Sequence, residues 1–188
     1  MLKKPKQCIK DKTVQGLIDI DQQVQQVGID VTVKNVYKFF SHNGTGKWKW
    51  MEEMVDCGVL GFSNKQRELP NVELIPWDIG NIIKLDQGAF IVTTNEVFSF
   101  KKTEFGHIYP RSSLNRCGVS LESAIFDPGY VGSATVLLMT VHNPNGLLIH
   151  QNAKIGQMLV FQTGFVAESY KGVYQGKTEV ANEVKKRV

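Results

Sequence analysis

Short apolar runs separated by turn residues dominate the chain from Val72 onward. Most runs are rich in β-branched and aromatic side chains, and glycine, proline, asparagine or aspartate stands between them. This arrangement is typical of short strands joined by turns. The expected strands cover residues 72–75, 82–85, 90–94, 97–100, 133–141, 147–149 and 155–161. Because helical periodicity is almost absent there, the pattern predicts an all-β sandwich or distorted barrel.

The first part of the chain carries other patterns. Residues 7–19 place apolar side chains at loosely helical spacing, which predicts one short helix. Residues 29–33 alternate apolar and polar side chains, which predicts a strand, and Gly28 permits a tight turn before it. Residues 41–46 have turn composition. Trp48 and Trp50 follow on one face of a short strand, where packing at an edge or subunit contact is favoured over base stacking.

The last stretch, residues 170–188, has few apolar residues and many charges. We therefore expect a mobile arm there, starting at about residue 168. No internal repeat and no linker divides the chain. The 188 residues are of ordinary size for one domain, and 42% hydrophobic residues are enough for a core. The sequence therefore predicts a single domain, residues 1–188.

The net charge of +4 is small, and much of it lies near the two ends. It suits an anionic ligand such as a nucleotide triphosphate, and we expect no nucleic-acid partner. The three cysteines, Cys8, Cys57 and Cys117, form no Cys-x-x-Cys, which favours a reduced intracellular protein. The sequence shows no secretory signal and no apolar run of membrane-spanning length, so we expect a cytoplasmic protein.

Several familiar kinds of site are absent from the sequence. It contains no zinc-deaminase signature, no Gly-x-x-x-x-Gly-Lys phosphate loop and no Gly-x-Gly-x-x-Gly. The four histidines lack metal-ligand spacing. Candidate chemistry is therefore confined to three blocks between residues 109 and 162.

The first block places Arg111, Ser112, Ser113 and Arg116 within six residues. Two guanidinium groups and two hydroxyls can bind several phosphate oxygens at once, and arginine can do so bidentately. The same residues also suit the capped start of a helix, since serine is a good N-cap. Residue types alone leave both interpretations open.

The second and third blocks each place a polar side chain among apolar ones. Asp127 and Tyr130 are predicted at the tip of a tight hairpin built from one proline and two glycines. Asp127 is a candidate to orient and deprotonate a water, or a turn residue that caps its own loop. Gln157 lies in a strongly apolar run, so it must bond either to a ligand or to a neighbouring strand.

In this order and spacing, the three blocks resemble the deoxyuridine triphosphatase (dUTPase) and deoxycytidine triphosphate (dCTP) deaminase superfamily. The resemblance covers roughly residues 28–162, from Gly28-Ile29-Asp30-Val31 onward, and Gly88 to Glu96 is similar to the deaminase branch. It implies a distorted β-barrel of jelly-roll type, assembled as a homotrimer with sites at the subunit interfaces. It also implies Mg²⁺ held chiefly by phosphate oxygens and waters, with no direct protein ligand.

The resemblance further implies a role for each site residue. Asp127 would activate water, and Tyr130 would pack against the deoxyribose. The backbone of residues 123–127 and the strand from Thr135 would hold the pyrimidine. The triphosphate would be bound by Arg111, assigned to the catalytic set, and by Ser112, Ser113 and Arg116, while Gln157 would bond to a phosphate or support the site.

The superfamily has two chemistries, and position 137 distinguishes them. The deaminase implied by the resemblance has a proton-transferring glutamate ten residues after the aspartate, whereas this chain has Leu137. We therefore expect hydrolysis of dUTP to dUMP and pyrophosphate. The alternatives are a dCTP deaminase, possibly bifunctional, and a nucleotide-binding regulator without catalysis.

Two features depart from the triphosphatase pattern. The glycine-rich arm with its phenylalanine is missing, and residues 170–177 look more like the deaminase tail. Tyr174, Gln175 and Lys177 are candidates to close over the nucleotide, against a tail that has no role. Residues 41–70 have no clear counterpart in the superfamily.

Overall fold

The computed structural model describes residues 1–39, 58, 60–63, 65, 67, 69–135 and 137–180. Predictions for the turn at 41–46, Trp48, Trp50, Cys57 and the last eight residues lie outside this range. The elements are α1 (Pro5–Lys10), β1 (Val14–Gln15), α2 (Ile20–Gln23), β2 (Ile29–Phe39), β3 (Val72–Ile75), β4 (Ile82–Leu85), β5 (Gly88–Thr94), β6 (Val97–Ser99), β7 (Glu104–Pro110), α3 (Ser112–Arg116), β8 (Val119–Glu122), β9 (Val131–Ser133), β10 (Leu137–Val141), β11 (Leu147–His150) and β12 (Lys154–Gln162).

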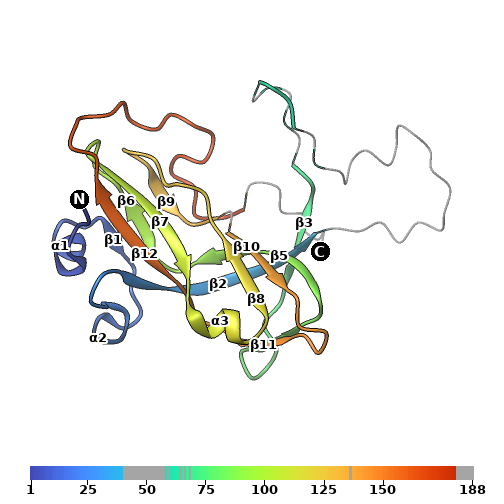
Figure 1. The fold of residues 1–188 in the computed structure, drawn as a ribbon. Helices are drawn as coiled ribbons and strands as arrows, with labels where there is room; N and C mark the ends of the chain where they lie inside the picture. The colour runs from blue at the N-terminus through green and yellow to red at the C-terminus, as the bar shows by residue number, and fades with distance from the viewer. Residues whose placement is uncertain are drawn as a thin grey trace.

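The main sheet is antiparallel and runs in the order β7-β12-β2-β5-β10-β8, with β3 paired to β2 (Figure 1). Its two edges meet where Gly106 of β7 and Phe126, just after β8, exchange backbone hydrogen bonds of 3.0 and 2.9 Å. Smaller sheets, β1-β6-β9 and β4-β11, complete the structure. This nearly closed, mostly β architecture confirms the predicted distorted barrel.

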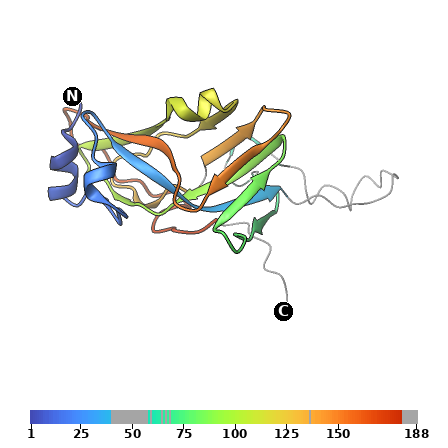
Figure 2. The ribbon, with the colours of Figure 1, turned by 90° about the horizontal axis from the view of Figure 1, so that it is seen from below.

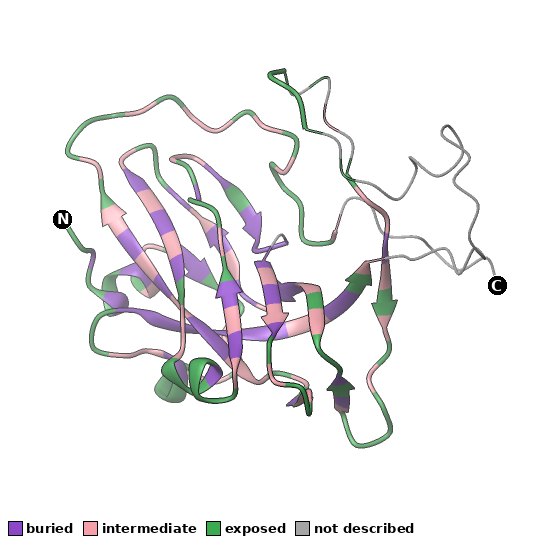
Figure 3. Cartoon of the chain, turned by 45° about the vertical axis from the view of Figure 1, so that its right-hand side comes forward, coloured by how far each residue is buried: buried purple, intermediate pink, exposed green. Residues whose placement is uncertain are grey.

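The core lies inside this barrel, where the buried strand positions gather (Figure 3). The rings of Phe98, Phe100 and Phe126 form an aromatic group with centroids 5.4–6.1 Å apart. Tyr130 joins it through Phe126, at 5.7 Å. Aromatic packing of this kind fixes the segment that follows β8 against the inside of the barrel.

The single helix expected over residues 7–19 is wrong in extent, although a short N-terminal helix is present. α1 ends at Lys10, because Lys12 adopts a left-handed backbone with φ 58°. The chain then forms β1, whose Val14 is buried opposite Phe98 of β6. α1 and α2 lie together at one end of the barrel (Figure 2).

Other boundaries also differ from the prediction. The run 133–141 is divided between β9, which pairs with β6, and β10, which pairs with β5 and β8. The strands β7 and β8 were not predicted, because β7 mixes charged, aromatic and glycine residues and contains no long apolar run. The tight turn expected before residue 29 is present, since Val24 forms a bridge with Ile29 and the Gln25 amide donates to the Gly28 carbonyl at 2.9 Å. Gly28 has a second role as well: a Cβ there would lie 2.5 Å from the Gln157 side chain, so glycine permits close packing against β12.

Candidate functional site

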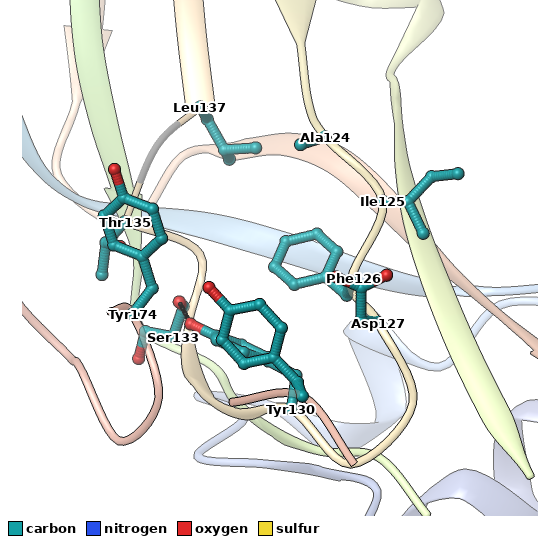
Figure 4. A pocket seen from close by; sticks show the side chains of 10 residues that line it. Ala124, Ile125, Phe126, Asp127, Tyr130, Ser133, Thr135, Leu137 and Tyr174 are labelled. Atoms are coloured by element: carbon teal, nitrogen blue, oxygen red, sulfur yellow. Dashed lines mark hydrogen bonds between the residues drawn. The ribbon is translucent and has the colours of Figure 1, made fainter. Parts of the chain in front are cut away.

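A cavity of about 220 Å³ lies beside the turn formed by residues 127–130. In Figure 4 the ring of Tyr174 lies beside Thr135, across the cavity from Ile125 and Asp127. Leu137 of β10 is buried where it borders the cavity. The lining residues are Ala124, Ile125, Phe126, Asp127, Tyr130, Ser133, Thr135, Leu137, Tyr170 and Tyr174.

The turn holds its two candidate residues in different environments. Gly129 has φ +77°, and the Tyr130 amide donates to the Asp127 carbonyl at 3.1 Å. Asp127 is exposed, as predicted for the tip. Tyr130 instead points inward and is only 6% exposed, because its ring packs on Phe126. The predicted exposure of Tyr130 at the tip is therefore wrong.

Tyr130 carries a neutral hydroxyl with a fixed partner. The hydroxyl donates to the Ser133 carbonyl at 2.7 Å. Burial, followed by the neighbouring Tyr170, raises the pKa of Tyr130 to about 12, since the phenolate would be poorly solvated. The ring is thereby held as a rigid wall of the cavity.

Part of the backbone expected to hold a pyrimidine is already engaged. The amide and carbonyl of Phe126 both pair with Gly106. The Ala124 carbonyl accepts the Ser123 hydroxyl at 3.2 Å. The Phe126 backbone is therefore unavailable to a base, and Thr135 supplies a buried hydroxyl on another side of the cavity.

A second group of candidate residues surrounds Asp30 of β2. The Asp30 side chain is 1% exposed and accepts hydrogen bonds from Arg111, from Gln157 at 3.3 Å and from Gln25 at 3.2 Å. The Lys154 ammonium lies 3.7 Å from the same carboxylate. A buried carboxylate needs such donors, and it holds the partly exposed Arg111 guanidinium in one place.

Helix α3 lies next to the Asp30 group and adds Ser112, Ser113 and Arg116 to it. We call the combined set the cationic cluster; its members are Arg111, Ser112, Ser113, Arg116, Lys154 and Gln157. Ser112, Ser113 and Arg116 are exposed, and Arg111 occupies the N-cap position without a side-chain capping bond. A helix start is thus present, but serine does not cap it. The cluster presents cationic groups and hydroxyls to solvent, a chemistry suited to phosphate oxygens.

The structure does not bring the cationic cluster and the cavity together within one chain. Gly106, beside Phe126, and Arg111 lie toward opposite ends of β7, and five residues of strand span roughly 16 Å. Figure 1 likewise shows α3 and β9 toward opposite ends of the barrel. Asp127, Tyr130 and Thr135 thus form one group, and Arg111, Ser112, Ser113, Arg116 and Gln157 form another.

The C-terminal arm, residues 168–180, lies against the cavity of its own chain. The Gln175 side-chain amide donates to the Gly129 carbonyl at 2.9 Å and accepts from the Val131 amide at 3.0 Å. The Gly176 amide donates to Val131, and the Lys177 carbonyl accepts from Ser133. Gln175 is therefore engaged with backbone, whereas Tyr174 lines the cavity.

Sequence reasoning missed three residues of these groups. No local pattern places Asp30 beside Arg111 and Gln157, which are 81 and 127 positions away in the chain, although Asp30 organises the cationic cluster. Lys154 immediately precedes the apolar run that contains Gln157, and this position in the sequence could have indicated that it belongs to the same group. Tyr170 packs on Tyr130 with ring centroids 5.6 Å apart, but an isolated aromatic residue in a polar tail gave little indication of a cavity wall.

Two kinds of feature are absent from the described residues. No three His, Cys, Asp or Glu side chains among them gather in a way that could hold a metal ion. Within the same part of the chain, no helix is long and apolar enough to span a membrane.

Comparison with known proteins places these features in a family. Deoxyuridine 5'-triphosphate nucleotidohydrolase of Methanocaldococcus jannaschii is 37% identical over 158 residues, covering 84% of this chain and 90% of that protein. A probable deoxyuridine 5'-triphosphate nucleotidohydrolase of Aeropyrum pernix is 33% identical over 155 residues, covering 82% and 86%.

A similar fold occurs in a solved structure. The crystal structure of 2'-deoxycytidine 5'-triphosphate deaminase from Agrobacterium tumefaciens aligns with a TM-score of 0.54 at 13% identity, over 82% of this chain and 45% of that one. The family model described as dCTP deaminase-like matches residues 3–163. The chain therefore belongs to the dCTP deaminase-like family, together with archaeal deoxyuridine triphosphate nucleotidohydrolases.

Proposed function

We propose that this protein is a dUTP diphosphatase that converts dUTP to dUMP and pyrophosphate. The observation that carries the proposal is the composition of one cavity, in which Asp127 lies at an exposed edge and Leu137 is buried in the wall. Asp127 is an exposed carboxylate suited to accept a proton from water. Leu137 has no proton to transfer, so it does not support deamination of a base. The archaeal relatives named as deoxyuridine triphosphate nucleotidohydrolases support the same choice.

In the proposed reaction, the pyrimidine and deoxyribose enter the cavity, where Tyr130 and Thr135 contact them. Asp127 accepts a proton from a water, and the resulting hydroxide attacks the α-phosphorus. The bond from that phosphorus to the oxygen bridging it to the β-phosphorus breaks, and pyrophosphate leaves with the bonding electrons. Arg111, Ser112, Ser113, Arg116 and Gln157 bind the triphosphate, where their charge and hydrogen bonds stabilise the developing negative charge.

We further propose that the protein is a homotrimer with sites shared between subunits. The separation of the cavity from the cationic cluster along β7 supports this arrangement. A neighbouring subunit then supplies the cationic cluster that a nucleotide in this cavity needs. Closed ring symmetry is a common way for heterologous contacts to repeat.

The proposed cofactor is Mg²⁺, which would arrive with the triphosphate. Mg²⁺ prefers several waters and substrate phosphate oxygens over a cage of protein ligands. This preference fits a cavity in which Asp127 is the one carboxylate among the lining residues that the structure describes. Bound there, Mg²⁺ would neutralise charge on the phosphate oxygens.

The arm belongs to the same proposal. Residues 1–188 form one domain, and the arm from about residue 168 closes the cavity with Tyr174 toward the nucleotide. The Lys177 side chain is exposed and is proposed to bind a phosphate. Gln175 contributes by holding the arm to residues 129–131, while its direct contact with nucleotide stays a prediction.

Hydrolysis in oxygen-18 water tests the mechanism. Attack at the α-phosphorus places the heavy oxygen in dUMP and leaves pyrophosphate unlabelled, which mass spectrometry of the separated products distinguishes. Label in pyrophosphate would contradict the proposed site of attack. Absence of any hydrolysis, with tight binding of a non-hydrolysable dUTP analogue, would instead indicate a regulator without catalysis.

A further inference from the structure

Arg67 contacts the cavity through the arm, although its part of the chain had no predicted role. Its guanidinium carbon lies 5.5 Å from the centre of the Tyr174 ring. Tyr174 is one of the two arm residues that line the cavity. Among the residues that the structure describes, no carboxylate lies within 4 Å of Arg67 to compete for its charge. The guanidinium is therefore in position for a cation–π contact.

The hydrogen bonds from the arm to residues 129–133 fix its backbone, whereas the Tyr174 ring is held by packing against the core and by its contact with Arg67. The side chain of Gln175 and the backbone of residues 176 and 177 bond to residues 129–133. The Tyr174 carbonyl accepts the Lys177 amide at 3.1 Å, which is again a backbone contact. The Tyr174 ring meets the cavity wall and Arg67. Arg67 thus supplies a contact from outside both the arm and the turn.

We propose that Arg67 is a positioning residue that holds the Tyr174 ring in the cavity wall and so supports closure of the arm. The inference rests on the proposed function, since it takes the cavity as the nucleotide site. Arg67 acts through Tyr174, so its effect appears in nucleotide affinity and arm order, with the chemical step unchanged. Arginine suits this role because its flat, permanently charged group stacks on an aromatic face.

Three single variants separate this role from a general effect of charge. Arg67→Gln removes the cation, Arg67→Lys keeps a cation, and Lys65→Gln is a matched control on an exposed neighbour in the same segment. We expect Arg67→Gln to raise KM for dUTP about fivefold with kcat nearly unchanged, a size consistent with one cation–π contact. Arg67→Lys should recover only part of the loss, because the ammonium keeps the charge but cannot stack on the ring as a guanidinium does. Lys65→Gln should match the wild type.

A double-mutant cycle with Tyr174→Leu identifies the partner. In that background, Arg67→Gln should have no further effect on KM. An equal effect in both backgrounds would overturn the proposal, because Arg67 would then act without Tyr174. Indistinguishable behaviour of Arg67→Gln and Lys65→Gln would overturn it as well.

Hydrogen exchange of peptides from residues 170–180, measured without nucleotide, tests the effect of Arg67 on the arm independently of any catalytic activity. Faster exchange in Arg67→Gln than in Lys65→Gln is expected if Arg67 orders the arm. Equal exchange in the two variants would contradict the contact. The two proposals can also fail separately. If exchange is faster in Arg67→Gln than in Lys65→Gln but the wild-type protein does not hydrolyse dUTP, the proposed function is refuted and the role of Arg67 in ordering the arm stands.

Discussion

Asp127 and Leu137 border the same cavity but supply different chemistry. Asp127 is exposed and can accept a proton from solvent, whereas Leu137 is 1% exposed and presents only methyl groups. Their positions depend on different elements, since Asp127 belongs to a turn and Leu137 begins β10. We propose that these two side chains decide between hydrolysis and deamination in a common fold.

Replacing Asp127 with asparagine should lower kcat for dUTP by a factor of about 10²–10⁴, the usual contribution of a general base. The amide keeps the size of the side chain but cannot take a proton, so binding of a non-hydrolysable dUTP analogue should change little. Steady-state kinetics and calorimetry measure the two effects. Asp86→Asn, on an exposed turn before β5, is the matched control, and full activity in Asp127→Asn would refute the assigned base.

Two cysteines should differ sharply in reactivity. Cys8 is 1% exposed, and burial raises its pKa to about 11, because a thiolate there would lose its hydration. Cys117 is exposed at the C-cap of α3. Brief alkylation at pH 8 followed by peptide mass mapping should label Cys117 in the native protein and Cys8 only after unfolding.

The raised pKa of Cys8 also sets the direction of a pH effect. The folded state favours the protonated thiol, so this stabilisation is fully present below the ordinary pKa of 9.0 and is lost as pH rises through about 11. Alkylation of Cys8 at the rate of Cys117 in native protein at pH 8 would contradict the burial argument.

At the scale of elements, the buried ammonium group of Lys3 holds the N-terminal segment to the barrel. The ammonium of Lys3 contacts Glu104 at 2.6 Å, Asp11 at 2.8 Å and the Thr13 hydroxyl at 2.9 Å. Burial alone would lower the pKa of Lys3, but the hydrogen bonds to Asp11 and Glu104 raise it above its ordinary value. These contacts join Asp11 and Thr13, which follow α1, to Glu104 of β7.

Replacing Lys3 with methionine should destabilise the protein by about 3 kcal/mol, because the buried Glu104 loses its cation. Urea unfolding at pH 7 measures the loss, and Lys4→Met at an exposed neighbour is the control. The difference should shrink at strongly alkaline pH, as Lys3 itself loses its proton. Equal unfolding midpoints for the two variants at pH 7 would show that the buried pair contributes nothing.

The arm is anchored by one side chain, Gln175, which forms hydrogen bonds with two backbone groups of the turn region. Gln175→Ala removes its bonds to Gly129 and Val131, each worth about 1 kcal/mol at most on an exposed surface. We expect KM for dUTP to rise about five- to tenfold, since an unanchored arm must be ordered by the nucleotide. Gln162→Ala, on the exposed end of β12, should leave KM unchanged. A Gln175→Ala variant with wild-type KM would indicate that closure does not depend on this clamp.

At the scale of the whole molecule, local patterns predicted the strands but not their partners. Apolar runs located β3, β4, β5, β11 and β12, because each has a local β-type composition. The run 133–141 is divided because β9 pairs with β6 in one sheet and β10 pairs with β5 and β8 in another. Strand pairing depends on residues far apart in the sequence, so the run itself does not reveal the division. The Asp30 group likewise joins residues 81 and 127 positions apart, so no local pattern reveals it. The motif residues themselves were recognisable, and their separation into two groups required the structure.

A shared site predicts complementation between two inactive variants. Asp127→Asn damages the cavity, and Arg116→Ala damages the cationic cluster on exposed α3. In mixed trimers, roughly a quarter of the sites combine an intact cavity from one chain with an intact cluster from another. Co-refolded mixtures should regain about that fraction of wild-type activity, and sedimentation should show trimers. Monomers, or mixtures that remain inactive, would contradict shared sites.

The most direct measurement supplies wild-type protein and Mg²⁺ with dUTP and dCTP in separate reactions, followed by chromatography of the products. The composition of the cavity, with Asp127 present and Leu137 in the wall, predicts dUMP and pyrophosphate from dUTP and no reaction of dCTP. Release of ammonia and formation of dUTP or dUMP from dCTP would contradict it, because deamination would then proceed without a carboxylate at position 137.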